Sequence, residues 1–89
     1  MAYKIEYAEG VAKDLRHLPR DVKLKALSAV ERVLSANPQD GKPLTGAYKG
    51  LWKYRIGDYR IIYAVEREKL VVFVLRIRHR KDVYRGIVY

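Results

Sequence analysis

The pattern of hydrophobic and polar positions changes its period along the chain, and each change marks a predicted element. Residues 3–7 (YKIEY) alternate aromatic or apolar side chains with charged ones, which predicts a short first strand. Beyond this strand, Val11, Leu15 and Leu18 recur at i, i+4 and i+7, the spacing of an amphipathic helix. Pro19 is expected to stop this helix, because proline disrupts a helix interior.

A second amphipathic helix is predicted after Pro19. Asp21 is expected to be its N-cap, and Asn37-Pro38 to close it, because the residue before a proline avoids the α region. The apolar face of this helix consists of Val22, Ala26, Val30, Val33 and Leu34. The two helices should form a hairpin, and we interpret the lysines and arginines on their outer sides as an ordinary solvated surface.

The second half of the chain predicts an antiparallel sheet. After a loop rich in Gly and Pro at residues 38–50, the period becomes two. The three expected strands are LWKYRI (51–56), YRIIYAV (59–65) and LVVFVLRIR (70–78), joined by turns at Gly57-Asp58 and at EREK (66–69). The predicted fold class is therefore α+β. An N-terminal strand and a helical hairpin precede a three-stranded antiparallel meander, the helices pack on one sheet face, and a single domain spans residues 1–89.

The first of these turns sets up a register that brings cations together. If Gly57 and Asp58 are the two turn residues, Arg55 faces Arg60 directly, and Lys53 lies on the same sheet face. Like charges in opposed positions destabilise a sheet by up to ~1 kcal/mol. A bound anion would convert this repulsion into charge-assisted hydrogen bonds. The register thus favours an anion site, although the same three cations could also form the wet side of a half-exposed sheet.

The last strand brings either His79 or Arg80 to this basic face. Pairing Val65 with Leu70 across the second turn would place His79 on the Arg60 side and Arg80 on the other. A turn one residue longer or shorter, or a bulge, reverses the assignment. The sequence does not fix this parity, so both residues are candidates for the site.

Composition narrows the class of partner. A net charge of +9 on 89 residues creates a positive potential that attracts polyanions, of which nucleic acid is the commonest. Because the chain has no cysteine, disulfides and thiolate chemistry are excluded. Its two histidines, His17 and His79, stand far apart in the sequence, so we expect neither a metal site nor a cofactor. The longest apolar run, LVVFVL, is too short to span a bilayer, and we expect a cytoplasmic protein without a membrane partner.

Three motifs in order, PLTG (43–46), LWKYRIGDYRIIY (51–63) and IRHRKDVY (77–84), resemble the RelE/ParE superfamily of type II toxins, specifically its RelE-like branch. The resemblance covers essentially the whole chain and implies the β-α-α-β-β-β fold of that branch. It further implies an endoribonuclease that cuts messenger RNA, typically in the ribosomal A site. An acidic antitoxin would wrap around the toxin and hold it inactive in a hetero-oligomer.

The resemblance also assigns roles to individual positions. Lys53 and Arg55 match the family's basic strand positions, Arg60 its G-x-Y-R arginine, and Arg80 the arginine of the final basic motif. The implied catalytic set is Lys53, Arg55, Arg60, His79, Arg80 and Tyr84, with the Tyr84 ring stacking on the substrate base. General attraction for RNA is expected from Lys49, Arg76, Arg78 and Lys81.

The implied chemistry is consistent with this set of cations. RNA supplies its own nucleophile, the 2′-hydroxyl, so cleavage requires no metal, serine or cysteine. It requires a proton acceptor, cations for the phosphorane and a donor for the leaving 5′ oxygen. The guanidinium forks of Arg60 and Arg80 match phosphate oxygens, and the proton acceptor would be His79 or Lys53. The products would be a 2′,3′-cyclic phosphate and a 5′-hydroxyl end.

Two other functions fit the same fold or charge. One is a ParE-type toxin that inhibits DNA gyrase without nuclease activity, and the other is a basic RNA-binding module without catalysis. The pair Arg55 and Arg60 and the ending HRKDVY favour the ribonuclease, because a gyrase inhibitor has no evident need for clustered phosphate-binding cations.

Overall fold

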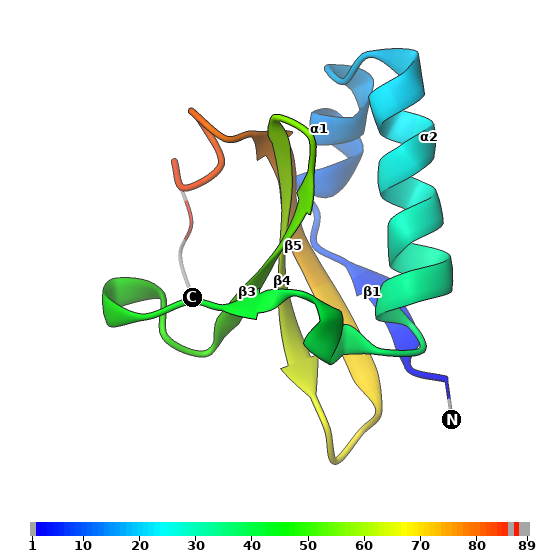
Figure 1. Cartoon of the computed structure of the whole chain (residues 1–89), viewed down its shortest axis with the longest axis vertical. Helices are drawn as coiled ribbons and strands as arrows, with labels where there is room; N and C mark the ends of the chain where they lie inside the picture. Colours follow the sequence, from blue (N-terminus) through cyan, green and yellow to red (C-terminus); the bar gives the residue numbers. More distant parts are fainter. Residues whose placement is uncertain (1, 86, 88–89) are drawn as a thin grey trace.

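The computed structural model describes residues 2–85 and 87. A mixed sheet stands at its centre, with the helices α1 and α2 on one side and the segment after β5, together with η3, on the other (Figure 1). The elements in chain order are β1 (Lys4–Tyr7), α1 (Val11–Arg16), α2 (Arg20–Ser28), the π-helical η1 (Ala29–Leu34), the short 3₁₀ helix η2 (Pro38–Asp40), β2 (Lys42–Pro43), the 3₁₀ helix η3 (Gly46–Tyr48), β3 (Leu51–Ile56), β4 (Tyr59–Glu66) and β5 (Val71–His79).

The sheet has five strands in the order β1-β5-β4-β3-β2. The antiparallel meander β3-β4-β5 and the helices on one face confirm the predicted α+β fold. Two further pairings were not predicted. β1 lies parallel to β5, and the two-residue strand β2 pairs with β3 inside the segment predicted as a loop. Pro43 is compatible with this strand because β2 is the edge of the sheet.

The helix boundaries differ from the prediction at Pro19. α1 ends at Arg16, and Pro19 is the N-cap residue of α2, so it begins the second helix instead of ending the first. The missing N–H of proline costs nothing there, because the first N–H groups of a helix have no partner within it. Asp21 makes no capping hydrogen bond, and the prediction that it is the N-cap was wrong. Its carboxylate instead lies in the first turn, where the helix dipole favours an acidic residue.

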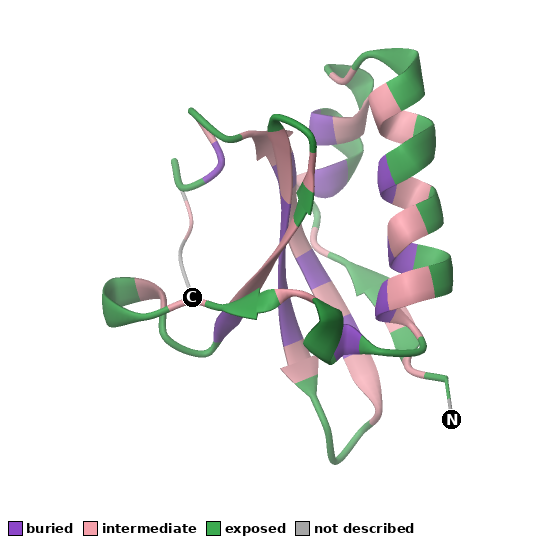
Figure 2. Ribbon diagram, viewed as in Figure 1, coloured by how far each residue is buried: buried purple, intermediate pink, exposed green. Residues whose placement is uncertain are grey.

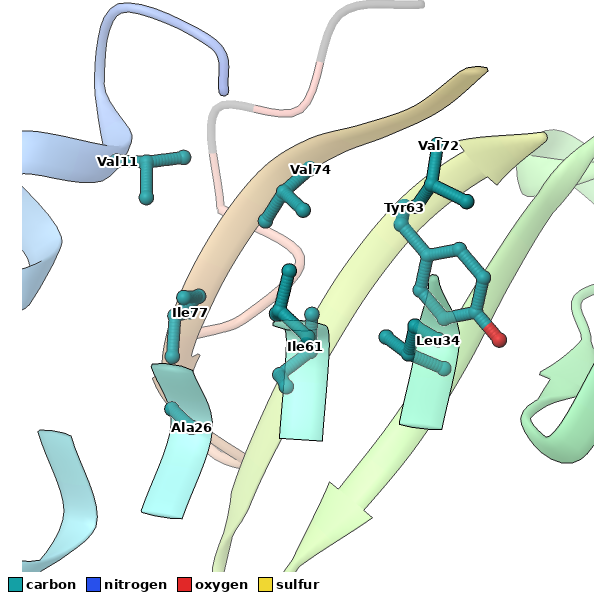
Figure 3. Packing of buried hydrophobic residues seen from close by; sticks show 9 residues of the cluster. Val11, Ala26, Leu34, Ile61, Tyr63, Val72, Val74 and Ile77 are labelled. Atoms are coloured by element: carbon teal, nitrogen blue, oxygen red, sulfur yellow. The ribbon is translucent and has the colours of Figure 1, made fainter. Parts of the chain in front are cut away.

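The main core lies between the helices and the sheet. Alternate positions of β4 and β5 point toward the buried side chains of α1, α2 and η1, and Tyr63 packs over Leu34 (Figure 3). The buried members are Val11, Ala26, Val30, Leu34, Ile61, Tyr63, Val72, Val74 and Ile77. This cluster fixes the face of the sheet that α1 and α2 cover.

A second, smaller cluster covers part of the opposite face. It consists of Leu51, Ile62, Ala64 and Val83, so the segment after β5 folds back onto the sheet. The four residues 61–64 of β4 are therefore buried on both sides, which gives the sheet a rigid centre (Figure 2). The end of this face near the β3-β4 turn, with Arg55 and Arg60, lies outside this cluster.

The register of the sheet is fixed differently on the two sides of β4. Arg55 pairs with Arg60 across Gly57-Asp58, as the two-residue turn predicts, and Gly57 has the positive φ of +56° that such turns use. On the other side Val65 pairs with Val72, so the pairing of Val65 with Leu70 was wrong. The register also shifts at Ile62 and Tyr63, where β5 contains an extra residue.

A buried tyrosine ties the segment before β3 to the core. The Tyr63 hydroxyl donates a hydrogen bond of 2.6 Å to the Pro38 carbonyl, and burial raises the pKa of Tyr63 to about 12. Gly41 lies against the same hydroxyl. A Cβ at position 41 would collide with the Tyr63 hydroxyl and lie 2.6 Å from the Lys53 carbonyl. Position 41 therefore accepts only glycine if η2 and β2 are to keep their places.

The substitution Gly41→Ala should lower the free energy of unfolding by about 1–3 kcal/mol, because the added methyl group overpacks a site bounded by backbone. Gly10→Ala is the matched control, since its Cβ would meet the Arg76 guanidinium at an ordinary 3.5 Å. Urea denaturation of the two variants and the parent measures the difference. Equal midpoints for the two variants would contradict the proposed close contact.

Candidate functional site

Three arginines form a row of opposed strand positions on the sheet face away from α1 and α2, and the side chain of the third, Arg78, reaches back to Asp14 of α1. Arg55 pairs with Arg60, and Arg60 pairs with Arg78, so the three occupy directly opposed positions on β3, β4 and β5. Directly opposed Cβ atoms lie ~5 Å apart. The backbone N–H of Arg80 donates to the Asp58 carbonyl at 2.8 Å and continues this register one step past the strand. Arg80 itself is the first residue of the turn after β5, and its guanidinium lies near the Asp58 carboxylate.

His79 lies on the opposite face. It pairs with Tyr59, and the two rings meet edge to face with their centroids 5.3 Å apart. Of the two candidates that the sequence left open, His79 therefore lies on the face opposite to Arg60, and the Arg80 backbone lies beside the β3-β4 turn. The cause is the extra residue in β5, which moves every later side chain of that strand to the other face. Arg78, predicted only as a general RNA contact, becomes the direct neighbour of Arg60.

Lys53 belongs to the same face and lines a groove at the β3 edge. The groove has a volume of about 310 Å³ and brings Lys53, Arg55 and Arg60 together. Lys42 on β2 lies directly opposite Lys53 and lines the groove as well. Sequence reasoning missed Lys42, because a strand of two residues shows no alternation that could reveal it.

The guanidinium groups of the row are held in different ways. The Arg60 guanidinium donates to the carbonyl oxygens of Gly57 at 2.8 Å and Tyr59 at 3.0 Å, so the hairpin turn orients it. Arg80 lies 3.9 Å from the Asp58 carboxylate in an exposed pair, which contributes little to stability. The Arg55 side chain is exposed. The Arg60 guanidinium is thus prearranged by the β3-β4 turn, while the Arg55 and Arg80 side chains are exposed and Arg78 is paired with Asp14.

Tyr84 stands at the edge of this face. Its ring stacks on Tyr48 of η3 with the centroids 5.0 Å apart and the planes 27° apart, and the residue is 36% exposed. The preceding residue, Val83, is fully buried against the sheet and anchors the segment. Lys49 and Lys81, predicted as RNA contacts, are exposed and adjoin these aromatic and buried anchors in the chain. The segments before β3 and after β5 therefore carry an aromatic surface and two further exposed cations.

Asp14 on α1 holds the end of β5. β1 pairs with β5 only as far as Val74, and beyond that point the Asp14 carboxylate accepts the Ile77 N–H at 3.2 Å. The same carboxylate accepts Arg78 Nε at 2.8 Å and lies 3.5 Å from an Arg76 nitrogen. Asp14 is only 3% exposed. It replaces the missing strand partner and neutralises the charge of Arg78, a member of the row.

The sequence does contain a signal for Asp14 that was not used. Asp14 lies three residues after Val11 and four before Leu18, within the apolar stripe of its helix. An acidic residue in such a stripe must find a partner when it is buried. Its partners, Arg76 and Arg78, lie 62 and 64 residues away, and only the fold brings them together.

Two further observations concern the described residues alone. Within 2–85 and 87, no three His, Asp or Glu side chains gather closely enough to hold a metal ion. Over the same residues, none of the helices has the length and apolar character that crossing a membrane demands.

Comparison with known proteins identifies relatives along nearly the whole chain. Residues 5–84 match the family model described as the ParE toxin of the type II toxin–antitoxin system parDE. Toxin RelG of Mycobacterium tuberculosis is 33% identical over 86 residues, which cover 96% of this chain and 99% of that protein. The mRNA interferase toxin RelE of Escherichia coli is 34% identical over 93 residues, covering 99% of this chain and 96% of that protein.

Solved structures agree with these matches. The toxin–antitoxin complex RelBE2 of Mycobacterium tuberculosis contains a chain that superposes with a TM-score of 0.84 at 30% identity, over 92% of this chain and 95% of that one. The isolated RelE toxin of Escherichia coli superposes with a TM-score of 0.71 at 26% identity, over 88% and 84% of the two chains. The family model bears the ParE name, whereas these relatives bear RelE-type names.

The substitution Asp14→Leu should lower the free energy of unfolding by about 1–3 kcal/mol, because it leaves the Ile77 N–H buried without an acceptor. Asp14→Asn keeps an oxygen for that N–H and should be the milder change. Asp21→Leu, an exposed acidic position in α2, is the matched control and should stay within about 0.5 kcal/mol of the parent. Chemical denaturation measures all three, and an Asp14→Leu protein as stable as the Asp21→Leu protein would contradict the clamp.

Proposed function

This chain belongs to the ParE toxin family of type II toxin–antitoxin systems. From its RelE-type relatives within that match we infer that it is a RelE-like toxin that acts as an mRNA interferase. The relatives named above support the RelE-like function over gyrase inhibition, since one of them is named as an mRNA interferase. The observation that carries the proposal is the row Arg55, Arg60 and Arg78, with Arg80 held beside the β3-β4 turn at its end.

The row provides what cleavage of a phosphodiester requires. Arg60 and Arg80 would hold the scissile phosphate, because guanidinium groups bind two phosphate oxygens at once and stabilise the charge of the phosphorane. Arg60 is suited to this role because the carbonyl groups of the hairpin turn already fix its orientation. A cation that is positioned before the substrate arrives costs no rearrangement during the reaction.

The position of Lys53 favours it as the group that takes the proton from the 2′-hydroxyl. Lys53 lines the same groove as Arg55 and Arg60, whereas His79 lies on the other face beside Tyr59. A general base must lie within hydrogen-bond reach of the proton that it removes. Arg55 cannot serve, because guanidinium does not lose its proton in proteins.

Tyr84 would bind the base next to the cleaved bond. Its exposed ring lies at the border of the basic face, supported by Tyr48, and single-stranded RNA is commonly held by stacking of its bases on aromatic rings. Attack by the 2′-hydroxyl would then leave a 2′,3′-cyclic phosphate and a 5′-hydroxyl, without a metal ion.

A cognate antitoxin completes the proposal. The relatives of known structure include RelB–RelE complexes from Pyrococcus horikoshii and Escherichia coli. A net charge of +9 suits an acidic partner that covers the arginines when the toxin is held inactive. The site of action would be messenger RNA in the ribosomal A site, in the cytoplasm.

Arg60→Ala and Arg80→Ala should each reduce cleavage by about 10²–10³-fold and abolish growth arrest, because each removes a donor that stabilises the transition state. Arg32→Ala, an exposed arginine of η1 far along the chain from the row, is the control and should remain toxic. Primer extension on a translated message during induced expression measures the cleavage. Undiminished arrest in both variants would refute the enzyme, and loss of DNA supercoiling without RNA cleavage would identify gyrase as the target.

The ends of the RNA fragments should show which nucleophile acts. Attack by the 2′-hydroxyl expels the 5′ oxygen, so downstream fragments should accept phosphate from polynucleotide kinase without prior phosphatase treatment. Upstream fragments should end in a cyclic phosphate that blocks 3′ adenylation until it is removed. Fragments with 5′-phosphate ends would instead indicate a water nucleophile and would exclude the mechanism proposed for Lys53.

A further inference from the structure

A second hollow lies behind the end of β5, on the side of α1. It has a volume of about 400 Å³, within the usual range for a ligand site. α1 and the residues after it form one wall, and the ends of β4 and β5 with the following turn form the other. We call this hollow the α1 cavity. The proposed cleavage site on the opposite sheet face does not use it.

The walls of the α1 cavity combine aromatic rings with positive charge. The edge-to-face pair Tyr59 and His79 lies on the sheet side, and His17 lies on the helix side. Leu18 adds partly exposed apolar surface, and the fully buried Ile77 lies behind the wall. This is the composition of a site for a planar ring, since aromatic side chains stack on every base.

The carboxylates that line the α1 cavity already have cationic partners, so a further cation of the cavity can bind a phosphate. Asp14 is already bound to Arg78 and the Ile77 N–H, and Asp82 lies 3.6 Å from Arg85. Lys13 also lines the cavity, and within the described part of the chain no carboxylate lies within ion-pair distance of it. A ligand with one flat ring and one negative group matches both features, which is the chemistry of a nucleotide.

The α1 cavity is continuous with the proposed cleavage site through one residue. Arg78 pairs with Arg60 in the row and also lines the cavity. His79, in the cavity wall, is followed directly by Arg80 of the row. A single strand of RNA that crosses the end of β5 therefore reaches both places.

We propose that the α1 cavity is a nucleotide subsite of the toxin, which takes a base flanking the cleaved bond between His17 and the pair Tyr59 and His79, with Lys13 on its phosphate. The proposal rests on the function proposed above, because the RNA substrate supplies the nucleotide. Stacking tolerates any base, so the subsite adds affinity and fixes the position of the strand without setting a sequence preference.

The first test uses the two histidines as reporters. They are the only histidines of the chain and both line the cavity, so their ring-proton NMR signals report on this place alone. Adding 5′-AMP to the toxin should shift both signals in one saturable curve, and inorganic phosphate at equal concentration should not. Equal shifts with phosphate, or none with 5′-AMP, would overturn the subsite.

Lys13→Ala should weaken 5′-AMP binding at least about threefold, because it removes the cation for the phosphate. Lys25→Ala, an exposed lysine of α2 outside the cavity, is the matched control and should bind as the parent does. Both side chains are exposed, and a denaturation curve of each variant verifies folding. Equal affinity in the two variants would remove Lys13 from the site.

The second test connects the cavity to the reaction. Ribosome-bound messages that end one nucleotide beyond the cleaved bond, on its 5′ or its 3′ side, are compared with an extended message. The ratio of kcat/KM for extended over shortened message should fall about tenfold for one of the two sides in His17→Ala and Lys13→Ala, and stay unchanged in Lys25→Ala. An unchanged ratio on both sides would overturn the subsite. If the wild type cleaves no message, the proposed ribonuclease fails, while the 5′-AMP titration still decides whether the cavity binds nucleotides.

Discussion

The buried carboxylate of Asp14 fixes the end of β5, and the candidate site depends on the position of this strand end. β1 supports β5 only to Val74, and the last five residues of β5 would otherwise have a free edge. Asp14 accepts the Ile77 N–H and binds Arg78, so α1 takes over the work of a neighbouring strand. The residues held in this way include Arg78 and His79, and the row and the α1 cavity both begin there. One buried acidic residue therefore makes a strongly basic surface structurally possible.

The sheet combines this basic end with an unusually well-buried middle. Residues 61–64 of β4 are covered on both sides, by the helices on one face and by the segment around Val83 on the other. Repulsion within the row costs up to ~1 kcal/mol for each opposed pair, which the burial of β4 can readily offset. A functional site on a rigid strand can carry such unfavourable charges, because the scaffold keeps them in place until an anion arrives.

The parts of the fold that follow local rules could be predicted from the sequence, and the parts that depend on distant contacts could not. The alternation around Gly57-Asp58 was sufficient for the β3-β4 register and for the pair Arg55 and Arg60, since a two-residue turn leaves no freedom. The β4-β5 register had no such marker. Its turn places Leu70 at a positive φ of +53°, and the extra residue in β5 carries no sequence signature. Family resemblance supplied Arg80, which the local pattern left undecided. Asp14 had a signal in the apolar stripe of its helix, but its partners Arg76 and Arg78 could not be found without the fold, and Lys42 had no signal at all.

The parallel pairing of β1 with β5 determines when, during synthesis of the toxin, its basic face can assemble. Lys4 pairs with Val71 and Tyr7 with Val74, so the strand made first finds its place only beside the strand made last. Contacts this far apart in sequence form late, because the chain between them must be closed into a loop first. A growing chain on the ribosome can build the helical hairpin early but cannot close the sheet, clamp β5 with Asp14 or align its arginines. The basic face can therefore assemble only after β5 has been synthesised, however early the helical hairpin forms.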